Sequence, residues 1–155
     1  MTPAINTAKR ARIEFHLHEY DHDPNAASYG DEAAAKLGLD PDRVFKTLVV
    51  TVDGKTLGVA VLPVSHQLDL KRYAKAVGAK KAAMADKREV ERSTGYVLGG
   101  VSPLGQKKRL PTVVDDSVRD YATIFVSAGR RGMDIELSPA DLAALTGATF
   151  ADVAR

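Results

Sequence analysis

The stretch VFKTLVVTVDGKTLGVAVLPV, residues 44–64, consists of two apolar runs separated by a two-residue turn signal. Residues 44–52 and 56–64 are rich in β-branched side chains, which favour strands. Asp53-Gly54 between them is typical of the tight turn of a hairpin, because both central positions of that turn need residues that tolerate a positive φ. The stretch therefore predicts two strands paired antiparallel.

Segments with helical signals lie on both sides of this hairpin. Residues 69–78 carry apolar side chains at helical spacing between a capping residue, Asp69, and a terminating one, Gly78. Near the start of the chain, Thr2 can cap a helix whose first turn tolerates Pro3. Signals of this kind predict helices over residues 2–13, 31–37, 69–78, 86–92 and 138–146.

Further strands and one long loop account for most of the remaining chain. Strands are predicted over residues 15–20, 112–114, 122–127 and 133–137, the last two joined across a turn at 129–132. Four glycines and Pro103 within residues 94–111 exclude a long regular element there, so we expect a loop. Strands and helices do not alternate regularly. The order favours an α+β fold, with a mixed sheet flanked by helices, over a doubly wound parallel sheet.

The composition is that of a single globular domain, here residues 1–155, with 45% apolar and 27% charged residues. Its apolar stretches are far shorter than the roughly 20 residues of a membrane span, and no signal segment is evident, so we expect a cytoplasmic protein without a membrane partner. The absence of cysteine excludes disulfides, thiolate metal sites and a cysteine nucleophile. A net charge of +2 is too small to indicate a general nucleic-acid binder, and we expect no DNA partner.

The glycine-rich segment GYVLGGVSPLG, residues 95–105, is the first candidate for chemistry. Glycines let the backbone approach a ligand, and successive amides in turns can donate to a phosphate or a developing oxyanion. The segment matches neither the P-loop spacing nor GxGxxG. By pattern alone it could equally be a structural connection.

Two charged residues interrupt apolar strands. Lys46 lies between Phe45 and Leu48 with Thr47 beside it, so its ammonium must reach water or meet an anion. Asp134 lies between Met133 and Ile135. The pattern leaves open whether either residue faces a ligand or solvent, since alternation places polar side chains on the exposed face of many strands.

Histidines and basic clusters give weaker signals. His16 and His18 share one face of a strand, but nothing fixes a third ligand, so we predict no metal site. Basic residues cluster at 71–81 and 107–109 and could contact the phosphates of a nucleic acid or form a solvated face. The candidates for tRNA contact are Lys71, Lys107, Lys108 and Arg109.

Several motifs taken together resemble the YbaK family of freestanding aminoacyl-tRNA editing enzymes, and most closely its Cys-tRNA(Pro) deacylases. The matching stretches are YDHDP at 20–24, KLGL at 36–39, VFKTL at 44–48, QLDLK at 67–71, STGYVLGGVSPLGQKKRLPT at 93–112 and DIEL at 134–137. The resemblance covers nearly the whole chain. It extends to the editing insertion of bacterial prolyl-tRNA synthetases.

The resemblance implies a barrel-like, largely antiparallel core flanked by helices, with neither metal nor other cofactor. It implies catalytic roles for Lys46, Gly99, Gly100 and Ser102, and substrate contacts for Tyr20, Thr47, Ser127 and Asp134. Which of Gly99 and Gly100 faces the substrate stays open. The implied partners are the acceptor end of tRNA(Pro) and prolyl-tRNA synthetase, which makes the mischarged substrate.

The implied reaction cleaves the ester that joins cysteine to tRNA(Pro). Because the chain has no thiol and no Ser-His-Asp pattern at these positions, the resemblance favours attack by the sulfur of the substrate cysteine itself. Two alternatives remain: a deacylase for another misacylated tRNA, carrying alanine or serine, and a non-catalytic module that binds acceptor ends. Both need the same phosphate contacts.

Overall fold

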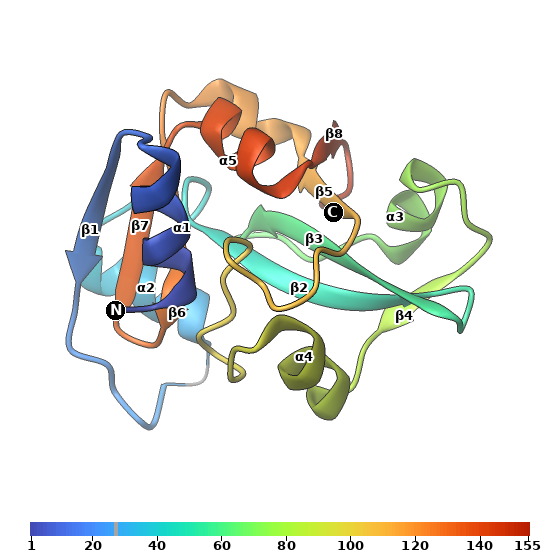
Figure 1. Ribbon diagram of the computed structural model, residues 1–155, viewed down its shortest axis with the longest axis horizontal. Helices are drawn as coiled ribbons and strands as arrows, with labels where there is room; N and C mark the ends of the chain where they lie inside the picture. Colours follow the sequence, from blue (N-terminus) through green and yellow to red (C-terminus); the bar gives the residue numbers. More distant parts are fainter. Residues whose placement is uncertain (27) are drawn as a thin grey trace.

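Two β-sheets with helices packed around them form the computed structural model, which describes residues 1–26 and 28–155 (Figure 1). The helices are α1 (Pro3–Ala11), α2 (Tyr29–Leu37), α3 (Leu70–Ala76), α4 (Lys87–Thr94), the short 3-10 helix η1 (Asp116–Asp120) and α5 (Pro139–Thr146). The strands are β1 (Phe15–Glu19), β2 (Phe45–Val52), β3 (Thr56–Pro63), β4 (Ala82–Met84), β5 (Thr112–Asp115), β6 (Ile124–Arg130), β7 (Met133–Leu137) and β8 (Thr149–Ala151). All five predicted helices and all six predicted strands are present.

The predicted hairpin is the centre of the larger sheet. β2 and β3 pair antiparallel from Phe45 opposite Pro63 to Val52 opposite Thr56, as predicted. The strand order of this sheet is β4-β2-β3-β5-β8, with β5 parallel to both β3 and β8. The smaller sheet, β1-β7-β6, is antiparallel throughout. The mixed, largely antiparallel α+β fold is therefore confirmed.

The expected barrel-like closure does not occur. The two sheets meet where Val44 forms an isolated parallel bridge with Phe125, supported by a 3.2 Å hydrogen bond from the Phe125 amide to the carbonyl of Arg43. A barrel needs continuous pairing around its circumference. In the described chain the backbone pairing between the sheets is limited to this bridge, so they remain two open sheets joined at one corner.

Two short strands are absent from the sequence-based prediction. β4 and β8 have three residues each, too few to show an alternating pattern. Each forms because a neighbour offers a free edge: β4 pairs with the end of β2 around Thr51, and β8 extends β5. Tertiary pairing, and not local propensity, fixes these two strands.

The small sheet has two faces with different roles. Val126 and Ile135 point to the main core, which also contains Ala4 and Ala8 of α1. Phe125, on the other face, packs with alanines of α2. Figure 1 shows α1 in front of this sheet and α2 behind it. Ser127 is two residues from Phe125 on β6, and its partner Asp134 is two residues from Glu136 on β7. Side chains two residues apart share a face, so Ser127 and Asp134 lie on the face toward α2.

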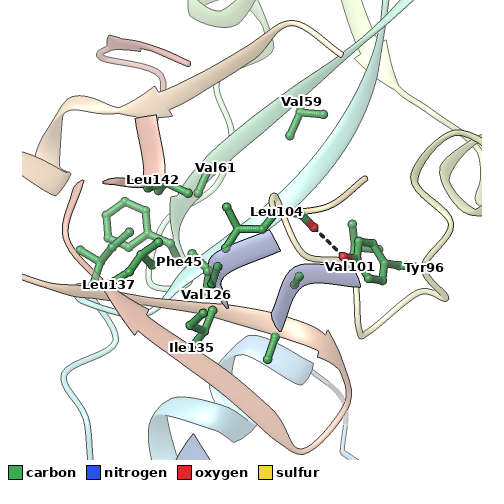
Figure 2. Packing of buried hydrophobic residues seen from close by; sticks show 14 of the residues in the cluster. Phe45, Val59, Val61, Tyr96, Val101, Leu104, Val126, Ile135, Leu137 and Leu142 are labelled. Atoms are coloured by element: carbon green, nitrogen blue, oxygen red, sulfur yellow. Dashed lines mark hydrogen bonds between the residues drawn. The ribbon is translucent and has the colours of Figure 1, made fainter. Parts of the chain in front are cut away.

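The glycine-rich segment is a loop, as predicted, but it is anchored in the main core. Tyr96, Val101 and Leu104 are buried members of that core, together with Phe45, Val61, Ile135 and Leu142. The Tyr96 hydroxyl donates a 2.5 Å hydrogen bond to the carbonyl of Leu104 (Figure 2). These contacts fix both ends of residues 96–104, so the backbone between them has a defined position against the sheets.

Candidate active site

A cavity of about 390 Å³ lies between α2, β2, the glycine-rich loop and the face of the small sheet that points toward α2. It is largely apolar, with a few polar groups that converge on it, which is the usual character of a small-molecule site. The residues that line it are Tyr20, Ser28, Tyr29, Gly30, Ala33, Val44, Phe45, Lys46, Thr47, Leu48, Leu98, Gly99, Val101, Ser127 and Asp134. Six of the eight predicted catalytic or substrate-contacting residues are in this set.

Lys46 and Thr47 enter the cavity from the start of β2. Lys46 is half-buried, and loss of hydration lowers the pKa of its ammonium, an effect that the charge of Asp31 partly offsets. No salt bridge involves Lys46 within residues 1–26 and 28–155. The Thr47 hydroxyl is buried and has no hydrogen-bond partner in that part of the chain. The Lys46 ammonium can therefore take a ligand as its partner.

Asp134 supplies the acidic side of the cavity. Its side chain is buried, with 5% of the residue exposed, and burial raises the pKa of its carboxyl to about 7. Tyr20 is close enough for the charge of Asp134 to add to the effect of burial, and both raise the pKa of the phenol. Ser127, directly opposite Asp134 on β6, accepts a 3.1 Å hydrogen bond from the amide of Gly129.

The amides of the glycine-rich loop differ in what they donate to. The Leu98 amide donates to the Glu91 carboxylate at 3.3 Å, and the Gly100 amide donates to the carbonyl of Val97 at 2.9 Å. The amides of Gly99 and Val101 have no acceptor among the described residues. Three residues of the loop line the cavity: Leu98, Gly99 and Val101. Of these three, Gly99 and Val101 have amides without an acceptor in the described part of the chain.

Gly100 and Ser102 do not reach the cavity wall. A Cβ at Gly100 would lie 2.9 Å from the Cα of Arg130, so this glycine allows the loop to pack directly on the β6–β7 turn. Ser102 is fully buried, and its hydroxyl accepts a 3.2 Å hydrogen bond from the amide of Leu104. Both residues therefore shape the loop without lining the cavity.

The predicted tRNA contacts lie outside the cavity. Lys71 is exposed on α3. Lys107, Lys108 and Arg109 are exposed on the chain that follows the loop, and the amides of Lys107 and Lys108 bond to the last residues of α4. None of the four residues is part of the cavity lining in the described structure.

Two of the chain's four histidines, His18 and His22, are paired with carboxylates, and His16 Nε2 lies 3.9 Å from the exposed Glu14 carboxylate. His18 Nε2 lies 2.9 Å from Glu136 Oε1, and His22 Nδ1 lies 2.7 Å from Glu32 Oε1. Residues 1–26 and 28–155 contain no group of three or more histidine and acidic side chains placed to hold a metal ion. No helix in the same ranges is long and apolar enough to cross a membrane.

Three residues at the cavity rim were not predicted from the sequence. Tyr29 and Leu98 line the cavity, and Arg131 connects them: its guanidinium lies 4.4 Å from the centre of the Tyr29 ring and donates to the Leu98 carbonyl at 2.6 and 3.2 Å. Tyr29 and Arg131 are more than 100 positions apart and carry no local pattern. Leu98 adjoins Gly99, which was the one available signal.

Comparison with known proteins identifies the family of this chain. Residues 23–145 match the family model for the aminoacyl-tRNA editing domain. The chain belongs to that family. This confirms the resemblance seen in the sequence, and the enzyme class is that of aminoacyl-tRNA deacylases.

Individual relatives support the assignment, one of them over nearly the full length. The chain is 40% identical to the "Putative Cys-tRNA(Pro)/Cys-tRNA(Cys) deacylase EbsC" of Enterococcus faecalis, over 98% of this chain and 92% of that one. It is 30% identical to the "Multifunctional Ser/Thr-tRNA deacylase ProXp-y" of Escherichia coli, over 62% and 60%. It also matches 18% of a proline–tRNA ligase of Shouchella clausii, at 35% identity over 66% of this chain.

The fold has a close counterpart among solved structures. The crystal structure of "a putative trans-editing enzyme for prolyl tRNA synthetase" superposes with a TM-score of 0.84 at 26% identity, covering 100% of this chain and 99% of the other. The present chain therefore has the same overall fold as that structure.

Proposed function

We propose that this chain is a trans-editing hydrolase that deacylates mischarged Cys-tRNA(Pro). The observation that carries the proposal is one cavity that combines a buried carboxylate, a half-buried ammonium and a free backbone donor, from Asp134, Lys46 and Gly99 respectively. An aminoacyl ester presents a cationic amino group, a polarised carbonyl and a phosphate-bearing ribose. The family, and the name of the relative EbsC, support this substrate class.

Each polar group has a role in this proposal. Asp134, when ionised, pairs with the substrate's amino group, and Tyr20 and Ser127 wall the same end of the cavity. Lys46 anchors the ribose or the terminal phosphate, with the unpartnered hydroxyl of Thr47 beside it. The Gly99 amide donates to the oxyanion. Gly100 supports catalysis by letting the loop pack against the β6–β7 turn, and Ser102 does so by bonding the loop's own backbone at Leu104.

The nucleophile in this proposal is the sulfur of the substrate cysteine. The thiolate forms a bond to its own ester carbonyl carbon, and the ester C–O bond breaks. The tRNA leaves as the free hydroxyl with a proton from solvent, and a cyclic thioester forms that water then opens to cysteine. Oriented intramolecular attack supplies about 7 to 11 kcal/mol, and one oxyanion donor adds about 3 to 4 kcal/mol. The chain therefore needs no nucleophile of its own.

The partners follow from the substrate. Prolyl-tRNA synthetase makes the mischarged tRNA, and the match of this chain to part of a proline–tRNA ligase supports a shared editing reaction. We propose that tRNA phosphates are contacted outside the cavity by Lys71, Lys107, Lys108 and Arg109. We also propose that the protein acts in the cytoplasm and has neither a membrane nor DNA as a partner. The proposed functional unit is the whole of residues 1–155.

A second candidate is a deacylase for serine or alanine esters, and the name of the relative ProXp-y, a Ser/Thr-tRNA deacylase, favours the serine ester. The experiment that separates the two is deacylation of Cys-tRNA(Pro), Ala-tRNA(Pro), Ser-tRNA(Pro) and Cys-tRNA(Cys), with and without the synthetase. Preferential release of tRNA from the cysteine esters supports the proposal. Preferential release from the serine or alanine ester supports the second candidate, and binding without release would identify a non-catalytic module.

A further inference from the structure

We propose that Arg131 is a positioning residue for the deacylation reaction, which fixes the Leu98–Gly99 peptide so that the Gly99 amide faces the cavity. The inference rests on the proposed function. It assigns a role to a residue in the β6–β7 turn, outside the cavity lining.

The contacts of Arg131 converge on one peptide. Its Nη2 and Nε donate to the Leu98 carbonyl at 2.6 and 3.2 Å, and its guanidinium stacks on Tyr29. Stacking on an aromatic ring holds a planar guanidinium in one orientation, so its two donors act as a fixed fork. Arg131 therefore connects the turn, the first residue of α2 and the glycine-rich loop.

The planar trans peptide transmits this contact to Gly99. In such a peptide the C=O of Leu98 and the N–H of Gly99 point in opposite directions. The carbonyl is bound to Arg131 at the rim, so the amide points away from the rim. That amide has no acceptor among the described residues, and Gly99 lines the cavity.

Gly99 itself would allow the peptide to rotate. Its φ is +91°, and glycine adopts positive and negative φ with similar ease, so the preceding peptide has more than one accessible orientation. The neighbouring peptides are held by Glu91 and Val97, through the amides of Leu98 and Gly100. Arg131 holds the peptide between them. A Cβ at Gly99 would lie 2.5 Å from Arg131 Nε, so glycine also leaves space for the guanidinium.

The test compares Arg131→Ala and Arg131→Lys with Arg130→Ala as the matched control. Arg130 is the adjacent exposed arginine, the last residue of β6, and its side chain contacts Met133 and Glu19 instead of the loop. The assay is steady-state deacylation of Cys-tRNA(Pro), with kcat and KM determined separately and folding checked by thermal unfolding. Because Arg131 is exposed and makes no core contact, we expect all three variants to fold.

The expected result is a kcat at least about 10-fold lower for Arg131→Ala, toward the roughly 100-fold cost of losing one oxyanion donor, with KM changed less than about 3-fold. Arg131→Lys, which keeps the charge but not the fork, should stay impaired, and Arg130→Ala should match the wild type. An unchanged kcat in Arg131→Ala, a loss confined to KM, full activity in Arg131→Lys or an equal loss in Arg130→Ala would each overturn the proposal. If Arg131→Ala did not fold, Arg131→Lys would decide alone. A wild-type protein that failed to deacylate would instead refute the proposed function.

Discussion

Ser127 and Asp134 are direct cross-strand partners on β6 and β7, and both side chains lie on the wall of the cavity. The hairpin places a carboxylate in a largely apolar enclosure, with a hydroxyl opposite it. Because burial penalises the charged form, Asp134 titrates near neutral pH, with a pKa of about 7. An incoming ammonium group would relieve that penalty.

The first prediction concerns the pH dependence of stability. The pKa of Asp134 is about 7 in the folded protein against 3.8 for an ordinary aspartate, so between about pH 4 and pH 7 the unfolded chain releases this proton while the folded protein keeps it. Stability therefore falls as the pH rises through this window, by up to about 4 kcal/mol. Asp134→Asn should be more stable than the wild type at pH 8 and show little advantage at pH 4. Urea unfolding at both pH values measures this, and a pH-independent difference would contradict it.

The second prediction concerns the unpartnered hydroxyl of Thr47. Thr47→Val removes a buried polar group that has no hydrogen bond, so the variant should be more stable by about 1 kcal/mol and should bind substrate more weakly. Thr51 is the matched control, since it lies on the same strand and its hydroxyl donates to the carbonyl of Ala83 at 3.4 Å. Thr51→Val should not gain stability. A gain of the same size in both variants would mean that the unpartnered hydroxyl is not its cause.

The third prediction concerns Lys46. Lys46→Ala should lower kcat/KM for Cys-tRNA(Pro) about 10- to 100-fold, the cost of one hydrogen bond to a charged group, and leave the thermal unfolding midpoint within a few degrees of the wild type. Lys55→Ala, in the exposed hairpin turn, is the control for loss of a positive charge. Equal activity in the two variants would exclude Lys46 from the site.

The fourth prediction tests packing in the second core cluster, which contains Tyr73. A Cβ at Gly58 of β3 would lie 2.3 Å from the buried Tyr73 hydroxyl, so Gly58→Ala should destabilise the fold by about 1 to 3 kcal/mol. Tyr73→Phe removes that oxygen, and the double variant should recover part of the loss. Additive effects in a double-mutant cycle would rule out this clash as the cause.

The sequence determined much of the fold through local signals. Asp53-Gly54 between β-branched runs predicts the central hairpin correctly, and the capping residues locate the helices near their observed bounds. β4 and β8 were missed because three residues contain no period, and their pairing depends on edges provided by β2 and β5. The prediction of a barrel-like core was wrong because closure depends on how the two sheets meet at Val44 and Phe125, which no local pattern encodes.

Residues of the cavity lining were predictable from the sequence where a residue type conflicts with its surroundings. Lys46 and Asp134 stand out because each interrupts an apolar strand, and both line the cavity. The choice between Gly99 and Gly100 depends on which amide is already bonded, which only the folded loop determines. The link from Arg131 to Tyr29 and Leu98 spans the chain, so no local pattern could indicate it.

The measurement that most directly tests the central claim is a side-by-side rate of deacylation of Cys-tRNA(Pro) and Ala-tRNA(Pro) by the purified protein. An enzyme whose attacking atom is the substrate's own sulfur should cleave the cysteine ester and leave the alanine ester intact, a difference far larger than the roughly 1 to 3 kcal/mol that pocket fit alone provides. Equal rates for the two esters would require water as the nucleophile and would contradict the mechanism.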